Sequence, residues 1–157
     1  MRNTSSTRGA SAPPPAAQPR RVREVMRRDF IKISGQETLL EALELMRLAR
    51  LRHLTVESEG VLVGILSYRD LQDALLARRD ALAARDETGV EKTAAVEHLT
   101  GAPFSIAPDA TLEEAAGRLE RLRVGCLPVV ERMEGGGLRV VGLLTETDLL
   151  RAAFSTT

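Results

Sequence analysis

The chain has 157 residues, of which 43% are hydrophobic and only 3% aromatic, so it can bury a core but lacks an aromatic platform for stacking bases or sugars. One cysteine excludes a disulfide framework, and one cysteine with two histidines argues against a tetrahedral zinc site. The sequence contains no run of about 18 apolar residues, so no membrane span is predicted. No apolar signal-peptide core lies near the N-terminus. We therefore expect a cytoplasmic protein without membrane association.

The net charge of zero hides an asymmetry along the chain. Residues 1–28 contain seven arginines and a single acid, Glu24, so the remaining residues carry an excess of six acids. An acidic body argues against general binding of nucleic acid. The basic segment alone could contact an anion, which a salt-dependent gel shift lost on deleting residues 1–20 would reveal.

Residues 1–20 are rich in Ser, Thr, Ala, Pro and Arg and include the run Pro13-Pro14-Pro15. Such a segment cannot bury enough apolar surface to offset the entropy lost on ordering it. We predict a disordered basic tail.

Beyond this tail the chain is an internal repeat. Residues 33–42, ISGQETLLEA, align with residues 106–115, IAPDATLEEA, at an offset of 73. Residues 63–71, VGILSYRDL, align with residues 141–149, VGLLTETDL, at an offset of 78. The difference falls at residues 132–137, where a glycine-rich stretch predicts a longer hairpin loop.

Each copy predicts the same order of elements. The strands are expected at residues 30–33, 54–57 and 61–66, and at 104–106, 127–130 and 138–144. Thr38 and Thr111 precede a helix in the two copies, and Glu41 and Glu114 complete a capping box. The apolar face of the first such helix is expected to contain Leu39, Ala42, Leu43, Met46 and Ala49. A second helix begins near Asp70 or Asp148.

Each copy therefore reads strand, helix, strand, strand, helix over about sixty residues, near the lower size limit for an independent core. Two copies packed about a pseudo-twofold would bury the sheet faces of both. We predict a mixed α/β fold made of two related β-α-β-β-α repeats. The predicted divisions are a tail at 1–20, repeats at 21–84 and 94–154, and a polar linker at 85–93.

Two hydroxyl–acid pairs, Ser67 with Asp70 and Thr145 with Asp148, are the candidate binding residues. A hydroxyl three residues before an acid at a helix start can serve as an N-cap with a first-turn charge. The same geometry suits a ligand, because the carboxylate can accept both hydrogen bonds of a ribose diol and the hydroxyl can donate to a phosphate. The two interpretations are compatible.

The ordered motifs resemble a tandem pair of cystathionine-β-synthase (CBS) domains, the Bateman module. The resemblance spans residues 22–154 and rests on the Thr-Leu-x-Glu-Ala helix starts, on Leu-Pro-Val-Val at 127–130, and on Gly-Leu-Leu-Thr-x-x-Asp-Leu at 142–149 with its counterpart at 64–71. Thr55 departs from the pattern, since the second copy has proline there. In CBS pairs the motif aspartate binds ribose, which implies this role for Asp70 and Asp148.

The turn before the second strand differs between the copies, with Arg52 and His53 in the first and Gly125 and Cys126 in the second. In nucleotide-binding relatives, basic side chains at this turn contact phosphates; the alternative is two polar residues at a helix-to-strand turn. Arg69 adds a third potential cation beside the first motif acid. The resemblance thus predicts one tight site, unless Arg121 or Arg123 supplies charge to the other. Cys126 is expected to be a small buried hydrophobe.

The resemblance implies a non-enzymatic regulatory sensor. It would bind AMP, ADP, ATP or S-adenosylmethionine between the repeats, with adenine packed on aliphatic side chains such as Ile65 and Leu143. No phosphate loop, dinucleotide fingerprint or nucleophile–base pair occurs in the sequence, so no catalytic residue, metal or resident cofactor is expected. We expect a homodimer with an unidentified protein partner. The alternative is a structural interaction module without a physiological ligand.

Overall fold

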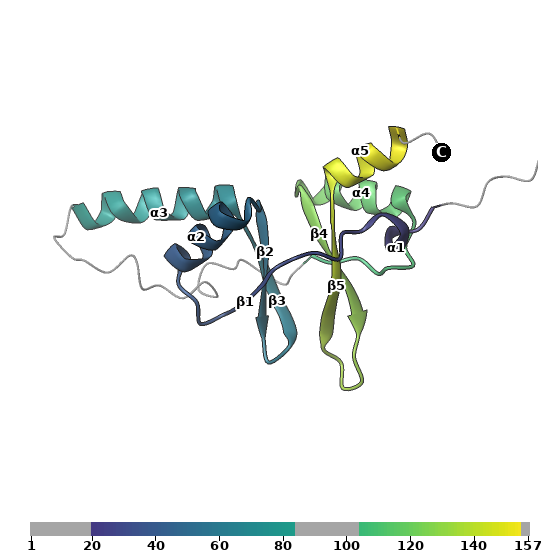
Figure 1. Cartoon of the computed structure of the whole chain (residues 1–157), viewed down its shortest axis with the longest axis horizontal. Helices are drawn as coiled ribbons and strands as arrows, with labels where there is room; N and C mark the ends of the chain where they lie inside the picture. Colours follow the sequence, from purple (N-terminus) through teal and green to yellow (C-terminus); the bar gives the residue numbers. More distant parts are fainter. Residues whose placement is uncertain (1–19, 84–103, 155–157) are drawn as a thin grey trace, which may run out of the picture.

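The computed structural model describes residues 20–83 and 104–154. The elements are α1 (Val22–Val25), β1 (Lys32–Ser34), α2 (Leu39–Ala49), β2 (His53–Ser58), β3 (Val61–Ser67), α3 (Tyr68–Ala83), α4 (Leu112–Leu122), β4 (Cys126–Arg132), β5 (Leu138–Thr145) and α5 (Glu146–Phe154). The predicted linker, and the predicted tail up to its last residue, lie outside the described residues. Figure 1 shows the hairpins β2–β3 and β4–β5 side by side, the first flanked by α2 and α3 and the second by α4 and α5. The predicted mixed α/β fold of two repeats is confirmed.

Repeat 1 contains a three-stranded sheet in the order β1–β2–β3, with β1 parallel to β2 and β2 antiparallel to β3. Helix α2 begins with the predicted capping box: the Thr38 hydroxyl accepts from Glu41 N–H, and the Glu41 carboxylate accepts from Thr38 N–H. Ala49 is exposed rather than on the buried face, because the helix ends there at a left-handed Arg50. The buried core comprises Ile33, Leu39, Ala42, Met46, Leu54, Val56, Leu66 and Leu71.

Repeat 2 contains the antiparallel hairpin β4–β5, but the strand predicted at residues 104–106 is reduced to a single parallel bridge. Ile106 N–H donates to the Pro128 carbonyl at 3.0 Å, and Val130 N–H donates to the Ile106 carbonyl at 2.9 Å. The prediction of a full strand here is therefore wrong.

Two prolines explain the shorter pairing. In repeat 1, Gly35 N–H donates to the Glu57 carbonyl of β2, and Thr55 N–H donates to the carbonyl of Ile31. The hydrogen bonds to β2 therefore extend past both ends of β1. The repeat offset puts Pro108 in the place of Gly35 and Pro128 in the place of Thr55. Proline has no N–H, so neither hydrogen bond can form in repeat 2.

Residues 20–27, which we call the N-terminal strap, pack on repeat 2. Val22 and Met26 belong to the same buried cluster as Leu119 and other core residues of repeat 2. Next to them, Arg27 N–H donates to the Leu143 carbonyl at 2.8 Å, and Leu143 N–H donates to the Arg27 carbonyl at 2.9 Å. In Figure 1 the chain runs from α1, beside β5, across to β1. The strap is thus part of repeat 2 in space, although the sequence division at residue 21 assigned it to repeat 1.

The repeats meet through β3 and β5. A small buried cluster of Leu62, Val130 and Val140 joins them, with Phe30 and Leu138 packed against it. This contact joins the two strands that lead directly into α3 and α5, the helices whose first turns carry the predicted binding motifs. In the part of the chain that the structure describes, no helix is both long and apolar enough to cross a bilayer.

Candidate functional site

The predicted residues of the first copy gather at the start of α3. His53 and Ser67 are partners across β2 and β3, and the Arg52 carbonyl accepts from Tyr68 N–H at 2.8 Å. Asp70 N–H donates to the Ser67 hydroxyl oxygen at 3.1 Å, and that hydroxyl donates to the Asp70 carboxylate. The hydroxyl and the acid therefore both lie at the positive end of the helix dipole.

The first-copy site has an exposed carboxylate and a neutral imidazole. Asp70 is exposed, and within the described residues its carboxylate accepts one hydrogen bond, from Ser67. Burial lowers the pKa of His53, although the nearby Asp70 charge opposes this shift and Arg52 adds to it. The imidazole is therefore neutral at pH 7. Of the three predicted cations, Arg52 and Arg69 remain, and both are exposed.

In the second-copy pair, Thr145 and Asp148 form hydrogen bonds with each other, and Asp148 is buried. Thr145 donates twice to one oxygen of Asp148, from its N–H at 3.0 Å and from its hydroxyl at 2.7 Å, and Asp148 N–H donates back to the hydroxyl oxygen at 3.3 Å. Asp148 is only 5% exposed. Burial, together with the Asp148 charge, raises the pKa of the Cys126 thiol to about 12, so this buried cysteine is neutral. The two motif aspartates thus share a spacing but differ in their access to a ligand.

The two residues predicted to pack against adenine also differ. Ile65 on β3 is half-buried, so a ligand can cover more of its side chain. Leu143 on β5 is only 7% exposed, and its backbone groups are already paired with Arg27 of the strap. The predicted packing role is open to Ile65, whereas Leu143 has little area left to contribute.

The strap brings arginines to repeat 2 that comparison of the repeats did not assign to it. Arg27 pairs with Leu143, two residues before Thr145, and Arg28 follows it; both side chains are exposed. The Arg27 side chain forms an ion pair with Asp29 at 3.5 Å. The sequence shows these arginines as a basic run before repeat 1. The position of this run does not indicate that it packs on repeat 2.

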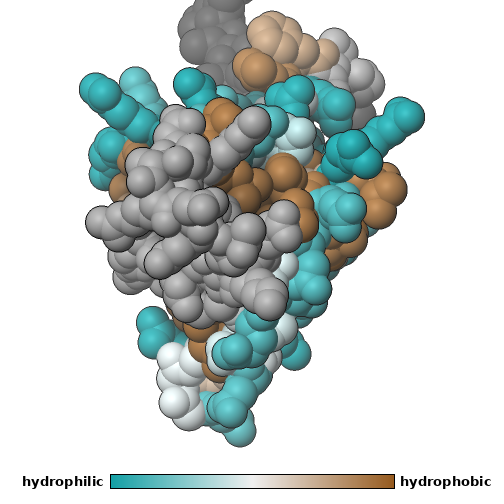
Figure 2. Space-filling view, turned by 90° about the vertical axis from the view of Figure 1, so that its left-hand side faces the viewer, coloured by the Kyte–Doolittle hydropathy of each residue, from teal (hydrophilic) through white to brown (hydrophobic). Residues whose placement is uncertain are grey.

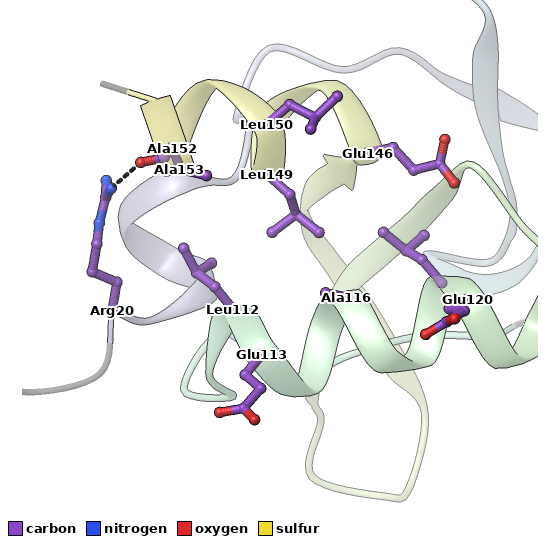
Figure 3. Close-up of a pocket in the computed structure, with 11 residues that line it drawn as sticks. Arg20, Leu112, Glu113, Ala116, Glu120, Glu146, Leu149, Leu150, Ala152 and Ala153 are labelled. Carbon is purple, nitrogen blue, oxygen red and sulfur yellow. Dashed lines mark hydrogen bonds between the residues drawn. The ribbon is translucent and has the colours of Figure 1, made fainter. Parts of the chain in front are cut away.

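The remaining candidates lie elsewhere. Arg121 and Arg123, the alternative cations for the second copy, are exposed at the C-terminal end of α4. A groove of about 690 Å³ runs between α4 and α5 and contains none of the predicted nucleotide-site residues (Figure 3). Among residues 20–83 and 104–154, no three His, Cys, Asp or Glu side chains are grouped closely enough to hold a metal ion.

Comparisons with known proteins match this architecture. The family model of the CBS domain matches residues 22–77 and 96–155. The chain is 32% identical, over 124 residues, to an uncharacterized 33.4 kDa protein in the ribosomal RNA operon of Thermofilum pendens; the match covers 75% of this chain and 40% of that protein. The chain thus spans less than half the length of this curated relative.

Two solved structures have a similar fold over most of the chain. A protein assigned to acetoin utilization (AcuB) from Vibrio cholerae is 29% identical with a TM-score of 0.70, covering 87% of this chain and 93% of that one. CBSX2, solved in complex with AMP, is 25% identical with a TM-score of 0.67, covering 85% and 95% of the two chains.

Proposed function

Because the chain belongs to the CBS-domain family, we propose that it is a non-enzymatic regulatory module that binds an adenosine-containing nucleotide. The AMP complex of CBSX2 supports this class of ligand. The observation that carries the choice of site is the exposed carboxylate of Asp70 at the N-terminus of α3. AMP, ADP, ATP and S-adenosylmethionine are the candidate ligands.

In the proposed complex, the ribose diol donates two hydrogen bonds to Asp70. An ionised carboxylate only accepts, and a diol carries two donors, so the two groups are complementary. Arg52 and Arg69 supply positive charge for a phosphate, and His53 takes part as a neutral hydrogen-bonding group. Ile65 packs against the adenine ring.

We expect one tight site per chain, at Asp70. For the same contact in repeat 2, Asp148 would have to become more accessible, because it is only 5% exposed. The asymmetry that we propose rests on the difference in exposure between the two carboxylates.

The proposed output is a shift in the packing of the two repeats or of two chains, rather than chemistry. We propose a cytoplasmic homodimer acting on a protein partner. The alternative, a structural module without a ligand, is favoured by the apolar groove between α4 and α5, which offers a docking surface independent of any nucleotide.

A thermal-unfolding screen against AMP, ADP, ATP and S-adenosylmethionine, with GMP for comparison, tests the proposal, and calorimetric titration then measures affinity. Asp70→Ala is expected to weaken binding about ten-fold or more, because it removes two hydrogen bonds to a charged acceptor. Its folding cost should not exceed about 1 kcal/mol.

Asp73→Ala is the matched control, because it removes the same charge from an exposed position one turn further along α3. It should leave affinity unchanged. Unaltered affinity in a folded Asp70→Ala protein would exclude the ribose role. No stabilisation by any nucleotide would favour the structural module instead.

A further inference from the structure

His53 is the one histidine in the part of the chain that the structure describes, and histidine is the side chain whose ordinary pKa lies closest to neutral pH. It lies on β2 opposite Ser67 and is half-buried. Among the described residues, its imidazole forms no hydrogen bond or ion pair. Both ring nitrogens are therefore free to contact a ligand without first breaking a contact within this part of the chain.

Charges of both signs surround this imidazole. The charged residues of the elements next to it are Arg52 before β2, Glu57 on β2, Lys32 on β1, and Arg69, Asp70 and Asp73 on α3. Strand β3 has no charged residue, and α2 packs with the opposite face of β2 among the buried core residues. Lys32 and Glu57 are paired with each other at 3.0 Å. The charges that act on the imidazole are those of Asp70 and Arg52, which have opposite signs.

The charge of the site changes sign when a phosphate enters it. Arg52, Arg69 and Asp70 together carry one excess positive charge. A phosphate ester adds about 1.5 to 2 negative charges at pH 7, so the occupied site has an excess of negative charge. One proton on His53 offsets this excess, and an imidazolium donates from both ring nitrogens. The phosphate thus stabilises the charged imidazole that burial disfavours in the free chain.

We propose that a phosphate-bearing nucleotide binds at this site together with one proton, which His53 takes up from the solvent. The inference rests on the nucleotide site proposed above. At high pH the bound form keeps His53 as the neutral hydrogen-bonding group already described. At lower pH His53 adds a third positive charge beside the phosphate. Because such coupling is reciprocal, affinity for the nucleotide rises as the pH falls, so the module responds to pH as well as to nucleotide concentration.

The coupling belongs to repeat 1 and to one class of ligand. Cys126 occupies the equivalent place in repeat 2, and burial raises the pKa of its thiol to about 12. A negative ligand would raise that pKa further, so the thiol stays neutral and exchanges no proton. S-adenosylmethionine carries a positive sulfonium group where AMP has a phosphate, and we expect it to bind without proton uptake at His53.

Calorimetric titration of the full chain with AMP tests this coupling. At pH 7 the titration is run in two buffers whose ionisation enthalpies differ, and the difference in heat gives the number of protons taken up. We expect net uptake at pH 7. Affinity should be at least about three-fold higher at pH 6.5 than at pH 8, because a close opposite charge shifts a pKa by about 1–3 units. S-adenosylmethionine should show neither effect.

Two variants assign the proton. His53→Gln should abolish the uptake and flatten the pH dependence, because glutamine forms hydrogen bonds but does not titrate. Arg52→Gln is the matched control, since it removes a fixed cation: AMP should bind less tightly, but proton uptake should remain. The imidazole NMR signal of the unmodified chain, followed against pH with and without AMP, makes the same assignment without a substitution.

Each variant is compared with the unmodified chain at the same pH and in the same buffer. Figure 2 shows why: hydrophilic side chains are spread over the repeat 1 end of the molecule, from its upper part to its lower tip, so a change of solution acts on many surface groups. The proton of AMP itself works against the expected sign, because a phosphate bound as a dianion releases that proton instead of taking one up.

The outcomes separate this inference from the nucleotide proposal. Equal affinity for AMP at pH 6.5 and pH 8 without proton uptake would overturn the coupling and leave nucleotide binding intact. Uptake that persists in folded His53→Gln would overturn the assignment to His53. Binding of S-adenosylmethionine but not of AMP would overturn the coupling alone, whereas failure of every nucleotide to bind would contradict both proposals.

Discussion

At the scale of single residues, equivalent backbone positions in the two repeats carry side chains of different chemistry. His53 and Cys126 occupy equivalent places, paired across the hairpin with Ser67 and Thr145 respectively. Burial favours the neutral form of each group, because it lowers the pKa of His53 and raises that of Cys126. Without a bound ligand, neither position therefore supplies a charge at pH 7.

The titration of His53 gives the first prediction. Because its pKa is lowered from 6.5 in the folded protein, the unfolded chain takes up a proton first as the pH falls. The stability that neutral His53 contributes is thus complete above pH 6.5 and lost between that value and the folded-state pKa. Unfolding measured at several pH values should show this loss, and His53→Gln should remove it.

Bound AMP should raise the pKa of His53, because a nearby phosphate favours the imidazolium form. The imidazole proton signals followed by NMR against pH, with and without AMP, measure the shift. The same pKa in both states would contradict contact between His53 and the phosphate while leaving the ribose contact at Asp70 to its own test.

The spacing of hydroxyl and acid was sufficient to predict the hydrogen bonds within both motifs, because a first-turn cap is a local interaction. It could not predict that Asp70 is exposed and Asp148 only 5% exposed. That difference depends on tertiary packing: α1, which precedes repeat 1 in the sequence, contacts α5, whereas α3 contacts α2 and β3 of its own repeat.

At the scale of elements, helix starts were predictable and the short first strand of repeat 2 was not. The capping boxes at Thr38 and Thr111 form as the sequence indicates, since their hydrogen bonds join residues three apart. The strand near Ile106 depends on amides supplied by two other positions, where repeat 2 has Pro108 and Pro128. Both prolines are evident in the sequence, but the hydrogen bonds that they remove can be identified only once the strand register is known.

The capping box of α4 gives a prediction at this scale. Thr111→Ala should lower the free energy of unfolding by about 1 kcal/mol, because the Glu114 N–H loses its acceptor. Denaturant unfolding measures the loss, and Thr111→Ser, which keeps the hydroxyl, should recover most of it. A loss of similar size in the serine variant would point to packing of the threonine methyl rather than to capping.

The same box has a pH dependence. Hydrogen bonds from Thr111 N–H and its hydroxyl lower the pKa of Glu114 below its ordinary 4.5. The stabilisation by the carboxylate is therefore present above pH 4.5 and lost as the pH falls through the folded-state pKa. Thr111→Ala should reduce this acid-dependent part of the stability, which unfolding at pH 7 and pH 3 can detect.

At the scale of the whole molecule, the N-terminal strap makes repeat 2 depend on residues that precede repeat 1. Val22 is fully buried in the core of repeat 2, and Met26 packs beside it. Alignment of the repeats identifies two similar units, but it holds no information on which unit a flanking segment covers. This long-range pairing is the part of the fold that the sequence pattern could not supply.

The strap lies so close to β5 that one methyl group should displace it. A Cβ atom at Gly142 would lie 2.8 Å from the sulfur of Met26 and 2.9 Å from the carbonyl oxygen of Arg27. The methionine can move, but the carbonyl is fixed by its hydrogen bond from Leu143 N–H. Gly142→Ala should therefore destabilise the protein by about 1–3 kcal/mol, as overpacking does, and loosen the strap.

Limited trypsin digestion reads out the strap directly, because four of its eight residues are arginines. Gly142→Ala should speed cleavage within residues 20–27 as it lowers the unfolding midpoint. Gly117→Ala on α4 is the control: nothing lies within 4 Å of its added Cβ, so it should raise stability by about 0.5–1 kcal/mol through helix propensity and leave strap cleavage unchanged. Equal cleavage of the Gly142 variant and the unmodified chain would mean that β5 accommodates the methyl group without releasing the strap, and that the contact at Arg27 is not what holds it.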